Sequence, residues 1–204
     1  MARIQGVDYE AMPAQANQMR GYGKQLNTEL VEVYARIADM HNSWYGKRYN
    51  ELVKAFNNMI PQLNDMLTLV VTEIPYALEV IANNYSQADR GIKVTTANNE
   101  GPNKITNLSI TNDVGMKFIT SNVAETQRNI SSNFTDAKDL MSRIESVYVK
   151  ISWQSEASEA FKAKFVKLKN DIVASFENIN AQFTKLMQQT QQDVQNAENA
   201  NTVE

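Results

Sequence analysis

One histidine and no cysteine limit the chemistry that this chain of 204 residues can perform. His41 is the sole histidine, and thiolate or disulfide chemistry is excluded. A single imidazole cannot supply a metal site, and no acidic cluster near it has the spacing of metal ligands. The sequence contains no recognisable nucleophile–base pair, phosphate-binding loop or tuned carboxylate pair. We therefore expect a protein that is not an enzyme, with no catalytic residues, no metal and no cofactor.

Charge and hydropathy narrow the classes of partner. The formal net charge is −3 and the pI is near 5.3, and the lysines of 162–169 follow two glutamates, which is typical of a solvated helix face. We expect no nucleic-acid partner. The most apolar stretch, 66–82, contains Glu73, Pro75 and Glu79 and is short for a membrane span. The first residues are too polar for a secretory signal, so any export would use another route.

Apolar residues recur in steps of three and four along two long stretches before residue 91. This spacing is typical of helices that pack on other helices. The first series is Met12, Ala16, Met19, Gly23, Leu26, Leu30, Val33, Ile37 and Met40, and the second is Leu52, Phe56, Met59, Leu63, Met66 and Val70. Pro61 and Pro75 predict kinks or interruptions in the second helix. The short connection at 42–46 predicts an antiparallel hairpin, which we expect to end at Gly91.

The same design follows a change in composition. Residues 92–112 are rich in Thr and Asn, and we interpret them as an extended linker rather than a β-hairpin. Helical spacing resumes from Asp113 to Ile151 and again, after Trp153, up to Leu186, before a Gln/Asn-rich tail that we expect to fray. The predicted fold is all-α, with helical hairpins at 1–91 and 113–204 joined by the linker 92–112.

The two halves are in register after their tryptophans. At 8, 12, 15, 19 and 26 residues beyond Trp44, and at the same offsets beyond Trp153, every position is apolar. Before the tryptophans the two apolar series do not align, which predicts that the turn at Trp153 is built differently.

A Trp-x-Gly turn between two long helices, here Trp44 and Gly46, resembles the WXG100, or ESAT-6-like, family. Members of that family are helical hairpins that pair into four-helix bundles and leave bacteria through type VII secretion systems. The Tyr-x-x-x-Asp/Glu motif of exported members is matched by Tyr85 and Asp89 in "YSQAD". The corresponding positions of the second half are Val194 and Glu198, and Ser155 stands where the glycine would be. The second half thus keeps the tryptophan and the acid and lacks the tyrosine and the glycine.

The resemblance implies a tandem protein that supplies both hairpins of the family's usual pair in one chain. We expect an intramolecular four-helix bundle that is a substrate of the type VII secretion ATPase and machinery. It would be secreted or located on the cell surface and would act with a secreted partner or effector. Its recognition residues would be Trp44, Gly46, Tyr85, Asp89, Trp153 and Glu198. A homodimer with exchanged hairpins would bury the same apolar residues. A scaffold without an export role and, less favoured, a membrane-active toxin using 66–82 are the alternatives.

Linker length bears on how the hairpins pack. Antiparallel hairpins, packed tip to tail, require the linker to run the roughly 45 Å length of a helix, at about 1.5 Å per residue. Residues 92–112 can span about 70 Å when extended, at about 3.3 Å per residue. We therefore expect an extended crossing along the bundle. This arrangement would bring Tyr85 and Asp89 beside Trp153.

Overall fold

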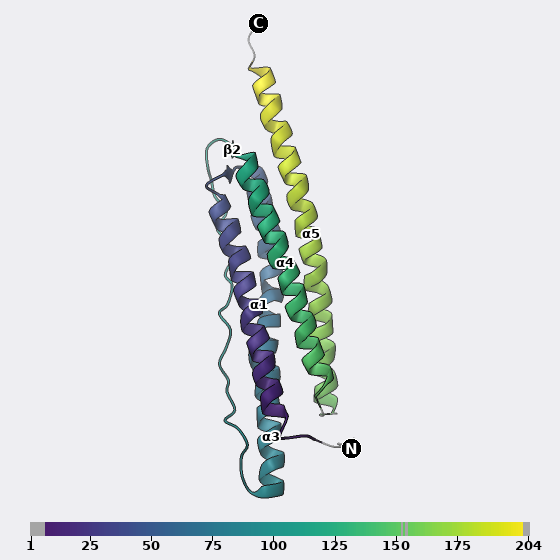
Figure 1. Cartoon of the computed structure of the whole chain (residues 1–204). Coiled ribbons are helices and arrows are strands. Elements are labelled where there is room, and N and C mark those ends of the chain that lie inside the picture. The colour runs from purple at the N-terminus through teal and green to yellow at the C-terminus, as the bar shows by residue number, and fades with distance from the viewer. Residues whose placement is uncertain (1–6, 152, 154, 202–204) are drawn as a thin grey trace.

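The computed structural model describes residues 7–151, 153 and 155–201, so the outermost residues of the two predicted hairpins lie outside the described part. Its elements are long helices and two very short strands (Figure 1). In chain order they are α1 (Met12–Met40), β1 (Trp44–Tyr45), α2 (Lys47–Thr68), the π-helix η1 (Leu69–Glu73), α3 (Ile74–Arg90), β2 (Lys117–Phe118), α4 (Thr120–Val149) and α5 (Glu156–Ala200).

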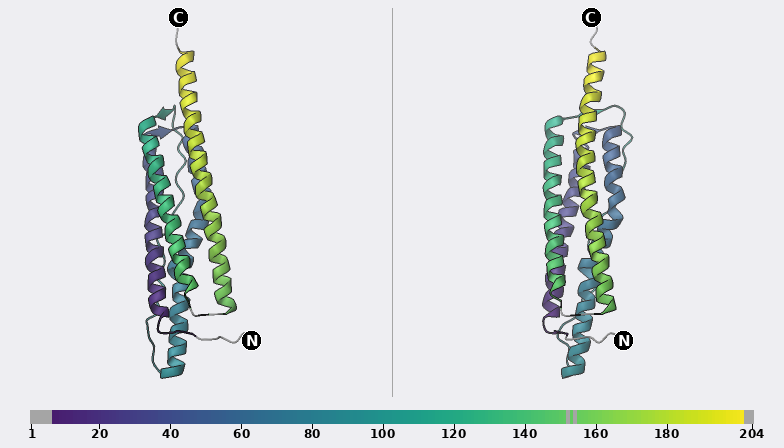
Figure 2. Two further views of the ribbon diagram at one scale, coloured as in Figure 1. Left: turned by 45° about the vertical axis from the view of Figure 1, so that its right-hand side comes forward. Right: turned by 90° about the vertical axis from the view of Figure 1, so that its right-hand side faces the viewer.

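The helices form a four-helix bundle, as the sequence predicted. Hairpin one consists of α1 followed by the continuous rod α2–η1–α3, and hairpin two consists of α4 and α5. Figures 1 and 2 show the hairpins packed tip to tail, with the β1 turn at one end and the α4–α5 turn at the other. In the bundle α1 packs mainly on α4, and α2 packs on α5.

The apolar series predicted for the first two helices forms the core. Every predicted position from Met12 to Met40, and from Leu52 to Val70, is buried. The prediction for the third helix was wrong at its start. That helix begins at Thr120 rather than Asp113, and Met116 and Ile119 are exposed. The reason is a competing use of the backbone, because β2 pairs with β1 and the Ile119 N–H donates to the Ser43 carbonyl, 2.8 Å away.

The two prolines of the second rod behave differently from each other. Pro61 lies within α2 without interrupting it, whereas η1 ends two residues before Pro75. Proline has no N–H to give to the carbonyl four residues earlier, which here belongs to Val71. That carbonyl instead accepts a hydrogen bond of 3.3 Å from Nε of buried Arg20. A hydrogen bond from a neighbouring helix thus compensates for the missing helical one.

The extended crossing is also present. We call residues 91–116 the strap: it leaves α3 at Gly91, runs along the outside of hairpin one without regular secondary structure, and reaches β2 at the opposite end (Figure 1). Only two large apolar side chains of the strap, Ile105 and Leu108, are buried. The remaining attachment is made largely by asparagine side chains of the helices.

The tail predicted to fray is helical in the structure. Helix α5 continues to Ala200 and extends past the end of the other helices (Figures 1 and 2). Beyond Thr190 its residues are almost all exposed, so packing does not hold them. The Gln, Ala and Glu residues of this stretch are good helix formers, which accounts for the helix. In the described residues no helix combines the length and the apolar character needed to cross a membrane.

Candidate recognition sites at the two ends of the bundle

Trp44 marks the first end of the bundle and is fully buried, at 0% exposure. Its ring stacks on Phe183 of α5, with centroids 5.8 Å apart and planes at 21°. The ring of Phe118, from β2, makes an edge-to-face contact with the indole, with centroids 5.6 Å apart. Trp44 and Phe118 are also direct partners in the antiparallel β1–β2 pair. The indole therefore plugs the end of the bundle and presents no surface to another molecule.

Gly46 is required by the backbone of this turn. It precedes α2 with φ 114° and ψ −167°, a conformation that is essentially restricted to glycine. A Cβ at this position would also lie 3.4 Å from the Gly115 carbonyl oxygen of the strap. The glycine of the Trp-x-Gly pattern thus has a local physical cause, the passage of the chain from β1 into α2.

Polar groups hold the strap to the same end. His41 Nε2 lies 2.8 Å from the Asp113 carboxylate. Hydrogen bonding from Thr111 and then from His41 lowers the pKa of Asp113. Nearby Tyr49 donates to the Ile37 carbonyl at 3.1 Å, and burial, together with the charge of Asp113, raises its pKa to about 12.

A hollow of about 380 Å³ lies beside Trp44 where α5 leaves the bundle, lined in part by Gly46, Met116 and Thr190. Arg48 on its rim reaches Asp193 of α5 at 3.4 Å. Glu198 lies farther along the exposed extension of α5. The first end therefore carries three of the predicted site residues: Trp44 and Gly46 inside the turn, and Glu198 on the extension.

The second end is built on a different turn, as the misaligned apolar series predicted. Trp153 is 7% exposed, and its ring lies 6.4 Å from that of Phe161 on the same hairpin. Ser155, in ordinary extended conformation, caps α5 by accepting the Ser158 N–H at 3.1 Å. Because position 155 has φ −156°, serine stands in place of the glycine without strain.

Tyr85 and Asp89 lie on the last turns of α3, Tyr85 half-buried and Asp89 exposed. The Asp89 carboxylate accepts a hydrogen bond from the Tyr9 hydroxyl, and this bond raises the pKa of Tyr9. Arg90 pairs with Glu10 and lies 5.5 Å above the Tyr9 ring. The N-terminal segment therefore contacts the predicted acid directly. Sequence reasoning missed this contact because nothing in the spacing links residues 80 positions apart.

The end of α3 and the α4–α5 turn lie at the same end of the bundle (Figure 1). A hydrogen bond of 3.1 Å from Gln15 to the Lys150 carbonyl joins the start of α1 to the end of α4 there. Tyr85, Asp89 and Trp153 thus share the second end. Within the described residues the ring neighbour of Trp153 is Phe161 and not Tyr85, so the two predicted partners share an end without stacking.

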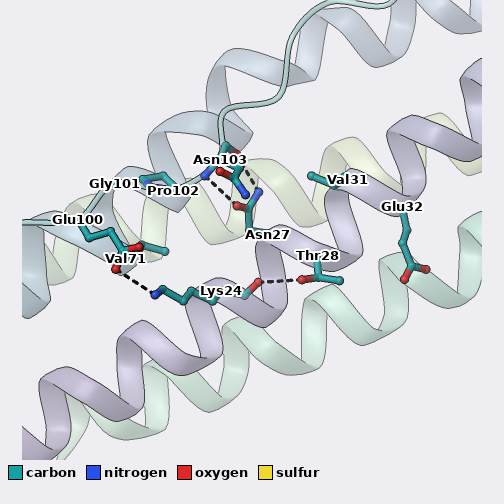
Figure 3. Close-up of a pocket in the computed structure, with 10 residues that line it drawn as sticks. All are labelled: Lys24, Asn27, Thr28, Val31, Glu32, Val71, Glu100, Gly101, Pro102 and Asn103. Atoms are coloured by element: carbon teal, nitrogen blue, oxygen red, sulfur yellow. Dashed lines mark hydrogen bonds and ion pairs between the residues drawn. The ribbon is translucent and has the colours of Figure 1, made fainter.

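A further hollow of about 380 Å³ lies at mid-length between α1 and the strap (Figure 3). Lys24 and Glu100 form an ion pair of 3.1 Å across its opening, and both are about half exposed. Asn27 binds the backbone of Asn103 in its wall. Its opposite charges are already paired, and no group of three metal-ligating side chains occurs among the described residues.

Comparison with known proteins matches the first hairpin to one family model. Residues 6–90 match the model of the WXG100 family, described as proteins of 100 residues with WXG. Members of this family are helical secreted proteins associated with type VII secretion and with dimerisation. No curated protein and no solved structure matches the chain.

Proposed function

We propose, from the WXG100 match of residues 6–90, that the whole chain is a non-enzymatic substrate of a type VII secretion system. In this proposal hairpin two is a second, diverged WXG100-like unit, so that one chain does the work of the pair that family members form. The observation that carries the proposal is the tip-to-tail packing of two hairpins whose apolar residues match in register after each tryptophan. The protein would leave the cell folded and act outside it.

Within this proposal the second end is the part that the secretion machinery recognises. It combines the tip of one hairpin, at Trp153, with the Tyr85 and Asp89 pair at the tail of the other, the combination expected when two hairpins pair. The exposed carboxylate of Asp89 and the half-buried ring of Tyr85 are accessible to a partner. Trp44, in contrast, has a structural role, because its indole has no exposed surface.

Secretion of point variants tests the proposal. Tyr85→Ala and Asp89→Asn should abolish export by a cell with a type VII system while the purified proteins keep their melting temperature. Matched controls are Tyr76→Ala and Asp65→Asn, which change exposed residues elsewhere on the same rod and should be exported normally. Normal export of both test variants would refute recognition at the second end.

A structural scaffold without export is the second candidate, favoured by the complete burial of Trp44. The wild-type chain distinguishes the two, since a scaffold would stay in the cell when the secretion ATPase is intact. Export that depends on this ATPase would exclude the scaffold.

A further inference from the structure

The strap is held by its backbone, as a bound extended peptide would be. Five asparagine side chains of the helices each make two hydrogen bonds to the backbone of a single strap residue. The amide oxygen accepts from the backbone N–H and the amide nitrogen donates to the backbone carbonyl, at 2.7 to 3.2 Å. We call each such pair of bonds a bracket. The brackets are Asn83 with Thr95, Asn27 with Asn103, Asn64 with Ile105, Asn57 with Leu108 and Asn50 with Thr111.

An ion pair makes a sixth contact of the same kind. Arg20 and Glu79 are buried and joined at 2.9 Å. The Glu79 carboxylate accepts a hydrogen bond from the Asn98 N–H at 2.7 Å, and Arg20 donates one to the Asn98 carbonyl at 3.1 Å. The charges of this buried pair are therefore further satisfied by the backbone of one strap residue, Asn98, which offsets part of the cost of burying them.

The spacing of the brackets fits an extended chain. Asn50, Asn57 and Asn64 are seven residues apart, a rise of about 10.5 Å along a helix for each step. Their partners in the strap are three residues apart, which corresponds to about 3.5 Å per residue, the rise of a fully extended chain. Helix α2 therefore places a bracket at every third residue of an extended segment.

Side chains add selectivity to this backbone recognition. Ile105 and Leu108, both bracketed, are 5% and 7% exposed, while Thr106, Asn107 and Ser109 face solvent. The surface thus selects two apolar side chains three residues apart and tolerates small polar residues between them. In the described part of the chain all six contacts come from α1, α2 and α3, so the site belongs to hairpin one.

We propose that this face of hairpin one is a binding site for extended polypeptide, which the strap fills in cis and which a strap-like segment of a separate chain can fill in trans. The ligand class is an extended segment with apolar residues at positions i and i+3 and free N–H groups at both. The site is independent of the export role proposed above.

The test uses a full-length variant in which a Gly/Ser segment of equal length replaces residues 102–112. The hairpins stay joined, and circular dichroism checks that the variant keeps its helical content. The probe is a fluorescent synthetic peptide of residues 102–112. We expect saturable binding with one peptide per chain to the variant, and none to the wild-type protein, whose site is filled.

Two N-methylated peptides identify the mode of binding. N-methylation at Leu108 removes a bracketed N–H and should weaken binding about tenfold, as expected for one lost hydrogen bond. N-methylation at Asn107, whose side chain faces solvent and which no asparagine brackets, is the matched control and should leave affinity within about twofold. Absence of binding to the helical variant, or equal binding of the two methylated peptides, would overturn the proposal.

Should the Gly/Ser variant lose its helices, a second variant decides the question. Protease sites are placed at exposed residues 91–93 and 112–115, and the chain is cut after it has folded. An excised strap that co-elutes with the hairpins and exchanges with the labelled peptide supports the site. An excised strap that elutes alone refutes it.

Discussion

Asn57→Ala tests the brackets quantitatively. The variant loses two hydrogen bonds, from Asn57 Nδ2 to the Leu108 carbonyl at 2.9 Å and from the Leu108 N–H to Oδ1 at 2.8 Å. At about 1 kcal/mol for each bond the loss is about 2 kcal/mol. Alanine is the better helix former and returns about 0.5 kcal/mol. The net free energy of unfolding should fall by about 1.5 kcal/mol, which corresponds to about 3–6 °C in melting temperature for a chain of this size.

Asn58→Ala is the matched control for this variant. Asn58 is the next residue of α2, and its side chain is exposed. The substitution carries the same gain in helix propensity without a lost bracket, so Asn58→Ala should be neutral or slightly stabilising. Equilibrium urea unfolding measures both, and the difference between them isolates the bracket. A difference under about 0.5 kcal/mol would show that water replaces the asparagine without cost and would refute the reasoning.

Three other predictions concern single positions. Gly23→Ala should lower the free energy of unfolding, since the new Cβ would lie 2.8 Å from Val71 Cγ2. Gly21→Ala is the control on the same helix: its Cβ would have no neighbour within 4 Å, so the better helix propensity of alanine should raise the free energy of unfolding by about 1 kcal/mol, as measured by thermal unfolding. Gly46→Ala should cost about 1–3 kcal/mol because of its positive φ, with Gly101→Ala, which has open space around it, as the control. The pKa of Tyr49 is about 12 in the folded protein and 10 in the unfolded chain. Its contribution to the free energy of unfolding is therefore complete below pH 10 and is lost as the pH rises towards 12. Unfolding of wild type and Tyr49→Phe across that window should show their difference change by about 2–3 kcal/mol, and a constant difference would contradict this.

The periodic features of the fold could be predicted from the sequence. The heptad spacing of α1 identified its buried residues, because a helix in a bundle buries one face in the core and the residues of that face recur at regular spacing. The length of the linker correctly indicated an extended crossing, because the distance between the two ends of the bundle sets how many extended residues are needed to span it.

The start of α4 could not be predicted in the same way. Met116 and Ile119 have helical spacing, but their backbone is used by the β1–β2 pair and its flanking hydrogen bond. Local periodicity carries no information about such long-range pairing. The prediction that the tail frays failed for the opposite reason. Helix propensity was sufficient to make the end of α5 helical where no packing supports it.

The positions of the candidate residues in the fold could be predicted in part. The residues that share the second end followed from the antiparallel arrangement, but the contact of Tyr9 with Asp89 did not, because an irregular N-terminal segment leaves no periodic signal. The brackets, in contrast, did leave a periodic signal in the sequence. Asn50, Asn57 and Asn64 recur every seven residues on α2, and polar residues repeated at heptad spacing beside an apolar series indicate a second, hydrogen-bonding face.

Joining the two hairpins in one chain necessarily makes the ends of the bundle different. Two identical hairpins packed tip to tail would have equivalent ends, each with a tryptophan turn beside a helix tail. A single strap must leave from one end and arrive at the other, so only the end of arrival, at Trp44, gains a covering strand, which carries Phe118. The Trp153 end receives no β-strand in the described residues, and the N-terminal segment contacts it instead, through the bond from Tyr9 to Asp89. This asymmetry supports a single recognition surface at the second end, because the strap already occupies the first.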